Sequence, residues 1–504
     1  MKKIGVVIFS TLLFAACQKA PENQWPDGVC YEIFIQSFAD GNGDGIGDLK
    51  GATSKLEYLK DLGVRAVWLM PIMNSPSYHK YDVTDYKSIH PDYGTIEDFR
   101  NFVKESHKRN IEVIIDMIIN HTSAEHPWFI EASQNMDSEY RDYYIWAYKD
   151  SIADQIAKKE ITHDSDNITQ WHPVNGDTLS QHYYGFFWGG MPDLNYDNEQ
   201  LRNEIIDIGK WWLTEMDVDG FRLDAAKHIF EYERMNENQD WWSFYSAEMK
   251  KIKPDVYIVG EVWDNSDLVA QFVNGLPAMF NFDLAGSINQ SLISEKANAS
   301  TIVGEHWKSI PNKTVVEMYV ENRAKYKEVN PEFRDATFLT NHDQNRVMSN
   351  LKGDVKKAKL AANILFTLPG SPFLYYGEEI GMIGVKPDEY IREPMIWKSK
   401  NDSLRTAWIK PKYSTETTVE SVEDQLNDSE SLLNHYKEWI KKRNSSEILL
   451  KGSISSIESE AGIIAFKRSY GNESLDIYHN LTGQTKLVAG KSLSAYSTII
   501  IESN

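Results

Sequence analysis

Several short apolar runs in this chain end in acidic side chains or are followed closely by one. Asp224 closes the run 220–224, Glu261 closes the run 256–261, and Asp343 follows the run 336–341. In a parallel barrel such positions lie at the carboxyl ends of buried strands, where active sites are built. The three carboxylates would then converge on one cleft. Two carboxyl groups facing a sugar bond are the minimum apparatus of glycoside hydrolysis, so we expect a glycosidase.

The elements that must position these carboxylates alternate along the chain as apolar strand-like runs and amphipathic helices. This is the βα pattern of a parallel sheet or barrel, and eight strands make a closed (β/α)8 TIM barrel the economical interpretation. The eight expected strands span residues 29–37, 64–71, 111–119, 220–224, 256–261, about 280–283, 336–341 and 372–376.

Two segments depart from this rhythm. Residues 121–182 are polar, aromatic and irregular, and a stretch of this length is better explained as an inserted small domain (B domain) after the third strand than as a loop. Beyond residue 450, short strands alternate with Gly and Asn turns, which predicts a C-terminal antiparallel β-domain, a small β-sandwich, over 450–504. The two parts of the catalytic barrel are then 29–120 and 183–449.

The N-terminus predicts export. Lys2 and Lys3 precede an apolar run, 4–14, that is too short to span a bilayer, and small residues precede Cys17, as at a bacterial lipoprotein processing site. We expect a lipoprotein signal peptide over 1–17, a tether over 18–28, and attachment to the outer membrane or cell surface through lipidated Cys17. The alternative is a periplasmic or secreted protein. Cys30, the second of 2 cysteines, should be a buried thiol.

The overall charge limits the partners. The chain has 504 residues and a net charge of −21, which argues against nucleic acid as a partner and favours cation binding. One glycine-rich stretch suits calcium, because oxygen-bearing residues recur at every second position as in the first nine positions of an EF-hand loop. The predicted ligands of a structural Ca²⁺ are Asp40, Asn42, Asp44, Ile46 and Asp48. Gly51 stands where an EF-hand needs Glu, and a polar turn without metal is the alternative.

Motifs in a fixed order give the chain a resemblance to a known family. They lie at residues 116–121, 191–195, 220–228, 260–263, 338–343 and 370–378. The chain resembles the α-amylase family, glycoside hydrolase family 13, and is most similar within it to the cell-surface amylase lipoproteins of Bacteroides-type starch utilisation, on residues 77–86 and 275–278. The resemblance implies an α-glucan or maltooligosaccharide substrate, and other starch-uptake proteins as candidate partners.

The resemblance also implies a role for each site residue. Asp224 resembles the nucleophile that forms a covalent glycosyl-enzyme with retention, Glu261 the general acid/base, and Asp343 the carboxylate that holds the sugar's 2- and 3-hydroxyls. The remaining candidates share contact with substrate or nucleophile: Arg222 orients Asp224, His121 and His342 bind hydroxyls, Tyr81 is a stacking platform, and Lys227 and His228 contact the leaving-group sugars.

Bond specificity is expected from a few positions. The resemblance implies α-1,4 over α-1,6 bonds, because Ala225 and Met191 stand where the α-1,6-glucosidases of the family typically carry Val and Gln. Asp82 and Arg392 resemble a pair that closes the subsite in exo-acting members. We expect an α-1,4-glucan hydrolase with endo action favoured. The alternatives are an exo-acting oligosaccharide α-glucosidase, a neopullulanase- or cyclomaltodextrinase-like enzyme, and a non-catalytic glucan-binding lipoprotein. Lys80, where the family often has Gly, is expected to be solvated.

Overall fold

The computed structural model describes residues 25–158, 165, 167–174, 181–303 and 306–503. The predicted signal peptide, Cys17 and residues 18–24 of the predicted tether lie outside the described residues. Within the described part of the chain, no helix combines the length and the apolar character needed to cross a membrane.

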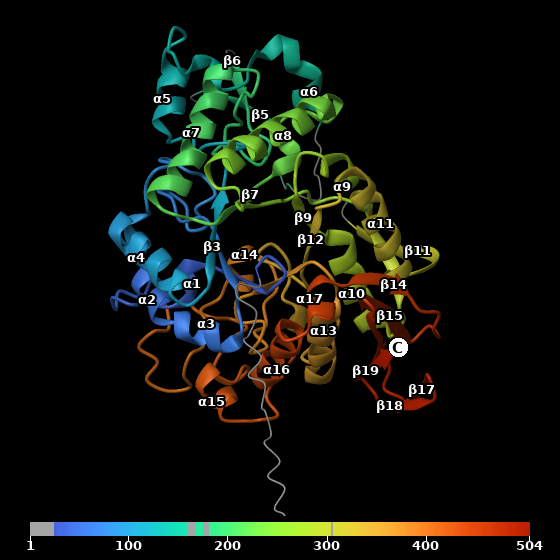
Figure 1. Cartoon of the computed structure of the whole chain (residues 1–504). Coiled ribbons are helices and arrows are strands. Elements are labelled where there is room, and N and C mark those ends of the chain that lie inside the picture. The colour runs from blue at the N-terminus through green and yellow to red at the C-terminus, as the bar shows by residue number, and fades with distance from the viewer. Residues whose placement is uncertain (1–24, 159–164, 166, 175–180, 304–305, 504) are drawn as a thin grey trace, which may run out of the picture.

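Eight parallel strands form a closed barrel with the order β1-β13-β12-β9-β8-β7-β3-β2 (Figure 1), which confirms the predicted fold class. They are β1 (Cys30–Ile33), β2 (Ala66–Leu69), β3 (Glu112–Met117), β7 (Gly220–Leu223), β8 (Tyr257–Gly260), β9 (Ala278–Phe280), β12 (Arg334–Thr337) and β13 (Ser371–Tyr375).

Two strands begin and end earlier than the sequence predicted. The sixth strand ends at Phe280 because the Asn281 side chain accepts a hydrogen bond from the amide of Leu284 and caps a helix, α10 (Phe282–Ser294). The seventh strand ends at Thr337, so the expected strand residues 338–341 lie in the loop that leads to Asp343.

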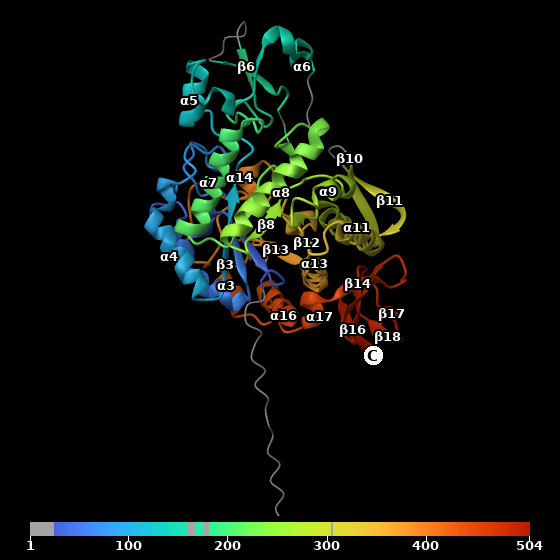
Figure 2. The ribbon, with the colours of Figure 1, turned by 45° about the horizontal axis from the view of Figure 1, so that its top comes forward.

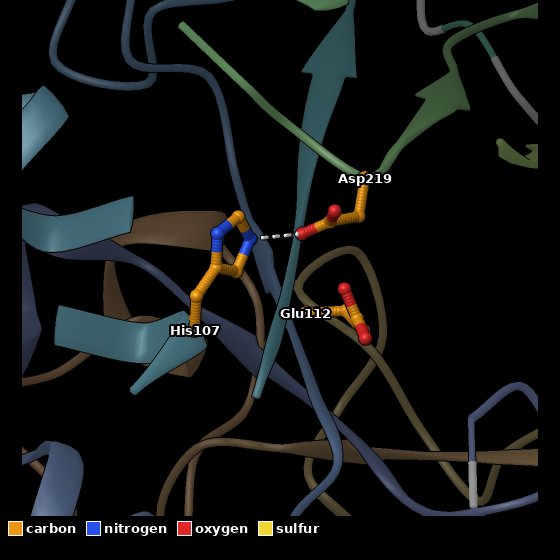
Figure 3. Close-up of side chains that lie close together, drawn as sticks. All are labelled: His107, Glu112 and Asp219. Carbon is orange, nitrogen blue, oxygen red and sulfur yellow. Dashed lines mark hydrogen bonds and ion pairs between the residues drawn. The ribbon is translucent and has the colours of Figure 1, made fainter. Parts of the chain in front are cut away.

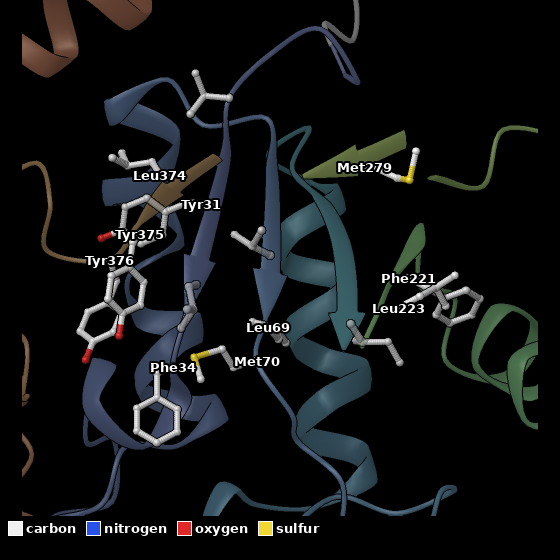
Figure 4. Packing of buried hydrophobic residues seen from close by; sticks show 14 of the residues in the cluster. Tyr31, Phe34, Leu69, Met70, Phe221, Leu223, Met279, Leu374, Tyr375 and Tyr376 are labelled. Atoms are coloured by element: carbon white, nitrogen blue, oxygen red, sulfur yellow. The ribbon is translucent and has the colours of Figure 1, made fainter. Parts of the chain in front are cut away.

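Alternate strand residues fill the barrel interior, as the two-residue period of a strand requires. The rings of Trp68, Phe280 and Phe373 come from three different strands and meet with centroids 4.9–6.1 Å apart. Cys30 faces the same interior as a free, fully buried thiol, as predicted. The residues between them, such as Tyr31, point outward and pack in the layer between strands and helices (Figure 4).

Helices surround the barrel, and local sequence signals fix their ends. Thr95 and Asp98 form a capping box at the start of α4, and Gly63, with φ 99°, ends α3 in the left-handed conformation that glycine adopts without strain. The helices outside the inserted domain are α1 (Ile35–Phe38), α2 (Leu49–Ser54), α3 (Leu56–Leu62), α4 (Ile96–His107), α7 (Glu199–Glu215), α8 (Met235–Ile252), α9 (Ser266–Phe272), α10, α11 (Val315–Val329), α12 (Val347–Asn350), α13 (Val355–Thr367), α14 (Asp388–Ile391), α15 (Val422–Leu426), α16 (Leu432–Asn444) and α17 (Glu447–Lys451).

The inserted domain follows β3 and lies at the top of Figure 1. It contains an antiparallel sheet of order β4-β6-β5, formed by β4 (Trp146–Tyr148), β6 (Gln181–Tyr184) and β5 (Trp171–Pro173), with helices α5 (Pro127–Gln134) and α6 (Ala153–Ala157). The predicted end of the inserted domain at residue 182 falls inside β6. Asp193 still forms a bridge with His121, so the inserted domain extends beyond the predicted boundary.

A hairpin that the sequence did not suggest, β10 (Asn298–Val303) with β11 (His306–Thr314), lies between α10 and α11. Its β11 strand is largely exposed and polar, so it lacks the apolar run that marks the barrel strands.

The C-terminal domain is an antiparallel sheet that lies beside α17 and α13 (Figure 2). Its strands are β14 (Ser453–Ser456), β15 (Ile463–Tyr470), β16 (Glu473–Asn480) and β19 (Thr498–Ser503), and the hairpin of β17 (Lys486–Val488) and β18 (Lys491–Leu493) packs on one face. Two fully buried arginines lie on either side of this contact. Arg468 of β15 joins the sheet to the barrel by donating to the carbonyl of Thr367, and it also donates to Gly452. Arg443 of α16 donates within the barrel to the carbonyls of Leu368 and Gly370.

Candidate active site

The three predicted catalytic carboxylates line one cavity of about 310 Å³ at the carboxyl end of the barrel. Asp224 follows directly after β7, Glu261 directly after β8, and Asp343 lies in the loop after β12. Lining residues of this cavity that the sequence also singled out are Tyr81, His121, Lys227, His228 and Arg392.

Arg222 forms the centre of the site. Its guanidinium is 1% exposed, and Nη1 donates to Asp116 Oδ1 at 2.9 Å and to Asp224, while Nη2 pairs with Glu261 Oε1 at 2.8 Å. Arg222 and Asp224 stand two residues apart and therefore on the same face of the strand. One buried cation thus orients three carboxylates, two of which are the predicted nucleophile and acid/base.

Glu261 has the properties of a proton donor at neutral pH. Burial raises its pKa to about 7, and the negative charges of Asp224 and Asp343 act in the same direction against the opposing effect of Arg222. Its Oε2 accepts a hydrogen bond from the amide of Ala225 at 3.2 Å. Ala225 presents that amide from a left-handed conformation, with φ 48°.

The pKa of Asp343 is shifted in the opposite direction to that of Glu261. Burial alone would raise its pKa, but His342 and then Arg392 outweigh that effect and hold the pKa well below its usual range. His342 Nε2 lies 3.0 Å from Asp343 Oδ2, and Arg392 Nη2 lies 2.8 Å from Oδ1. Asp343 therefore stays ionised and fixed at both oxygens.

His342 is kept protonated by two carboxylates. Its Nδ1 lies 2.5 Å from Oε1 of Glu32, a buried acidic residue of β1. Burial lowers the pKa of His342, but Asp343 and Glu32 together raise it to about 10. The sequence did not single out Glu32, although an acid inside an apolar strand run was the available signal.

Tyr81 links the residues around Arg222 to those around His342. Its ring stacks on that of His342 at 5.6 Å and 13°, and its hydroxyl lies 2.6 Å from His342 Nε2 and 3.2 Å from Asp116 Oδ2. Its carbonyl oxygen lies 3.2 Å from His121 Nε2. Asp116 is wholly buried, and burial raises its pKa to about 7. The sequence placed Asp116 in a motif but gave it no role.

Lys227 and His228 lie on the side of the pocket that Glu261 occupies. Lys227 Nζ donates to the carbonyl of Trp263 at 2.8 Å and pairs with Asp264 at 3.2 Å, both in the loop after Glu261. The His228 ring stacks on Phe186 of the inserted domain with centroids 4.0 Å apart.

Asp82 and Arg392 are both 3% exposed but bind different partners. Asp82 accepts hydrogen bonds from Ser75, at 2.7 Å, and from Ser77. Arg392 pairs with Asp343 and with Asp388 at 3.3 Å. Asp388, which also lines the cavity, is a further residue that the sequence did not single out.

The prediction that Lys80 is solvated is wrong, because Lys80 is only 3% exposed. Its Nζ donates to the Ser77 carbonyl at 2.6 Å, within the same turn that carries Tyr81 and Asp82. Its backbone has φ 66°, the left-handed conformation that glycine adopts without strain.

The predicted calcium loop is folded with its side-chain oxygens toward its own amides. Asp40 accepts from Gly43 at 2.6 Å and Gly45 at 2.7 Å, and its carboxylate is 4% exposed. Asp44 accepts from the amide of Ile46 at 2.8 Å, and Asp48 from that of Gly51. Among the described residues, the carboxylates of Asp40, Asp44 and Asp48 do not form a group with ligand atoms within 4.8 Å of one another, so calcium binding by this loop stays a prediction.

A different group of possible ligands lies at the opposite end of the barrel. In the described residues, His107, Glu112 and Asp219 bring ligand atoms within 4.8 Å of one another (Figure 3). Asp219 is already bonded to His107 Nε2 at 2.7 Å and to Lys253 Nζ at 2.5 Å. Because Lys253 supplies the compensating positive charge, this group is a structural ion-pair network.

Comparisons with known proteins agree with this geometry. The family model described as "Alpha amylase, catalytic domain" matches residues 32–452. The chain belongs to the α-amylase family. A crystal structure of the α-amylase from H. orenii is 41% identical, with a TM-score of 0.84, and the alignment covers 95% of this chain and 99% of that one. The predicted family and barrel are confirmed.

The family members that resemble this chain carry different activities in their names. "Alpha-amylase 3" of Dictyoglomus thermophilum is 41% identical over 95% of this chain and 90% of its own length. A 4-alpha-glucanotransferase of Thermotoga maritima is 33% identical over 94% of this chain and 100% of its length. Alpha-amylase SusG of Bacteroides thetaiotaomicron is 29% identical over 90% and 84%.

The raised pKa of Glu261 gives a testable pH dependence. Glu261 is protonated below its pKa of about 7 and loses the proton as the pH rises through that value. We predict that kcat/KM for maltoheptaose falls roughly tenfold per pH unit on the alkaline side of this pKa. An aryl α-maltotrioside with an acidic phenol as leaving group needs little protonation, and its alkaline limb should be shallow in the same titration. Identical limbs for both substrates would contradict the assignment of Glu261 as the acid.

Proposed function

We propose that this protein hydrolyses α-1,4-glucosidic bonds of starch, maltodextrin or related α-glucans with retention of configuration, as an α-amylase. The observation that carries the proposal is the arrangement around Arg222, which pairs with Asp224 and Glu261 in one pocket where burial raises the pKa of Glu261 to about 7. A carboxylate nucleophile beside a second carboxyl group that can donate a proton is what a retaining glycosidase requires.

The mechanism follows from this arrangement. An Asp224 carboxylate oxygen attacks the anomeric carbon as the bond to the leaving oxygen breaks, and Glu261 gives that oxygen its proton. The product is a covalent glycosyl-enzyme. Glu261, now ionised, takes a proton from water, whose oxygen attacks the same carbon and releases Asp224. Asp343, ionised and fixed by His342 and Arg392, would hold the sugar's hydroxyls as positive charge develops on the ring.

One observation supports endo action. Asp82 and Arg392, the pair that would close the pocket, bind Ser75 and Asp388 respectively and not each other. The pocket also adjoins a larger groove through Lys227 and His228, which gives a long leaving chain room. That groove does not distinguish endo from exo action, because an enzyme that removes single sugars from a chain end also has a long leaving chain.

We also propose two properties of the whole chain. A structural Ca²⁺ would be held by the side chains of Asp40, Asn42, Asp44 and Asp48 and the carbonyl of Ile46, where it would neutralise the carboxylates. The protein would be exported and anchored through lipidated Cys17, with the outer membrane or cell surface as its site and other starch-uptake proteins as candidate partners.

The proposed activity is tested by the time course of products from maltoheptaose and soluble starch, with protein that lacks residues 1–17. We expect rapid loss of iodine colour and mixed maltooligosaccharides. Early glucose would indicate an exo enzyme, and products longer than the substrate would indicate glucan transfer. Asp224→Ala should lower kcat by more than about 10³-fold, and full activity of this variant would end the assignment of the nucleophile.

Calcium should stabilise the fold without entering the reaction. Removing Ca²⁺ with EGTA is expected to lower the Tm of the wild type, because the cation binds the folded loop and not the unfolded chain. Asp44→Ala should already show the lower Tm and should not respond to EGTA. Equal Tm values with and without Ca²⁺ in the wild type would contradict the calcium site.

Anchoring is tested by the single substitution Cys17→Ser in the full chain expressed in a Gram-negative bacterium. Labelled palmitate should be incorporated by the wild type and not by the variant, and the variant should leave the membrane fraction. Unlabelled wild-type protein in the soluble exported fraction would instead show plain secretion.

A further inference from the structure

The first described residues of the chain are fixed to the barrel. The ring of Trp25 packs edge-on against the rings of Tyr257 and Phe373, with centroids 4.7 Å and 6.4 Å away. Two residues later, the carboxylate of Asp27 pairs with Arg334. These contacts involve β8, β12 and β13, so the position at which the chain enters the barrel is set by three strands.

Trp25 lies at the end of the barrel opposite to the catalytic pocket. A cavity of about 200 Å³ beside it is lined by Glu112, Tyr257, Ala278 and Arg334, which are the first residues of β3, β8, β9 and β12. The catalytic carboxylates come after the last residues of their strands. Because all eight strands are parallel, these two sets of residues mark opposite ends of the barrel.

The inserted domain stands on the pocket side of the molecule. Phe187 and Trp188, which follow β6, line the pocket. In Figure 1, β3 points toward this domain at the top of the molecule. The inserted domain and Trp25 therefore lie on opposite sides of the barrel.

The distance from the predicted anchor to Trp25 is limited. Only the seven residues 18–24 separate Cys17 from Trp25. Even fully extended, a segment of this length spans at most about 30 Å. A globular chain of this size is roughly 60 Å across. An anchor at Cys17 therefore keeps the amino end of the barrel near the lipid, and the tether is too short for the pocket to turn toward the membrane.

We propose that the anchored protein stands with the amino end of its barrel against the lipid headgroups and with its catalytic pocket open to the solution on the far side. The membrane-facing surface consists of Trp25, Lys250, Asp255, Glu332 and Arg334, which all line the 200 Å³ cavity. Its bases and acids balance, whereas the whole chain carries a net charge of −21. Anionic headgroups therefore repel this surface less than the rest of the protein.

This inference rests on the proposed lipidation of Cys17 and deepens it, because it states which surface meets the membrane. It also gives the anchor a role in access to substrate. A glucan polymer reaches the pocket directly from the surrounding solution and does not have to enter the narrow space between the protein and the bilayer.

The orientation is tested by energy transfer from the protein to the membrane. The lipidated full chain is placed in vesicles of phosphatidylethanolamine and phosphatidylglycerol that contain a rhodamine-labelled lipid. Fluorescein is attached to one of two variants: Asp255→Cys, at an exposed position of the membrane-facing surface, or Met136→Cys, at a position 63% exposed in the inserted domain. Cys30 is fully buried and should not react. We expect at least roughly twofold more transfer from position 255, since the tether keeps only that end within its reach.

Cys17→Ser, combined with each labelled variant, is the matched control and should abolish the transfer from both positions. Equal transfer from positions 255 and 136, or more from 136, would overturn the orientation. The two proposals are separated by a second attachment, in which a hexahistidine tag replaces residues 1–17 and binds a nickel-chelating lipid. Greater transfer from position 255 with this attachment, in a protein whose Cys17 incorporates no palmitate, would contradict the lipidation alone.

Discussion

The structure depends on one buried cation. Arg222 is almost inaccessible to water and contacts Asp116, Asp224 and Glu261 at once. Removing one partner from a buried ion pair is costly because it leaves an uncompensated charge, and here three acids would lose their common partner. The closed barrel makes this arrangement possible, since β3, β7 and β8 are neighbours and bring their side chains to one point.

The unequal distribution of positive charge separates the roles of chemically similar acids. Asp343 contacts two cationic partners, His342 and Arg392, whereas Glu261 contacts Arg222, which it shares with two other carboxylates. Asp343 therefore stays ionised and Glu261 has a pKa of about 7, although both line the same cavity. Glu32 acts on Asp343 indirectly, because the charge of Glu32 keeps His342 protonated.

The sequence predicted the barrel and the cluster of Asp224, Glu261 and Asp343 because both depend on a local signal, an apolar run followed by an acid. Glu32 is unusual as an acid inside an apolar strand run, but nothing local indicates that its charge meets a histidine 310 residues away, so its role was missed. The sequence also misjudged Lys80, because burial of a lysine depends on the fold of its own turn. The β11 strand of the hairpin is largely exposed and polar, and periodicity cannot separate such a strand from a loop.

The C-terminal sheet takes no part in the pocket, yet it contributes to the stability of the barrel. Arg468, which belongs to the sheet, donates to Thr367, the last residue of α13, and so satisfies one of the carbonyls that every helix leaves unpaired at its end. A gene truncated before residue 453 would encode a barrel with that acceptor bare and with the apolar face that packs on Ile464 and Phe466 uncovered. Shortening this enzyme at its C-terminus would therefore lower the stability of the catalytic portion.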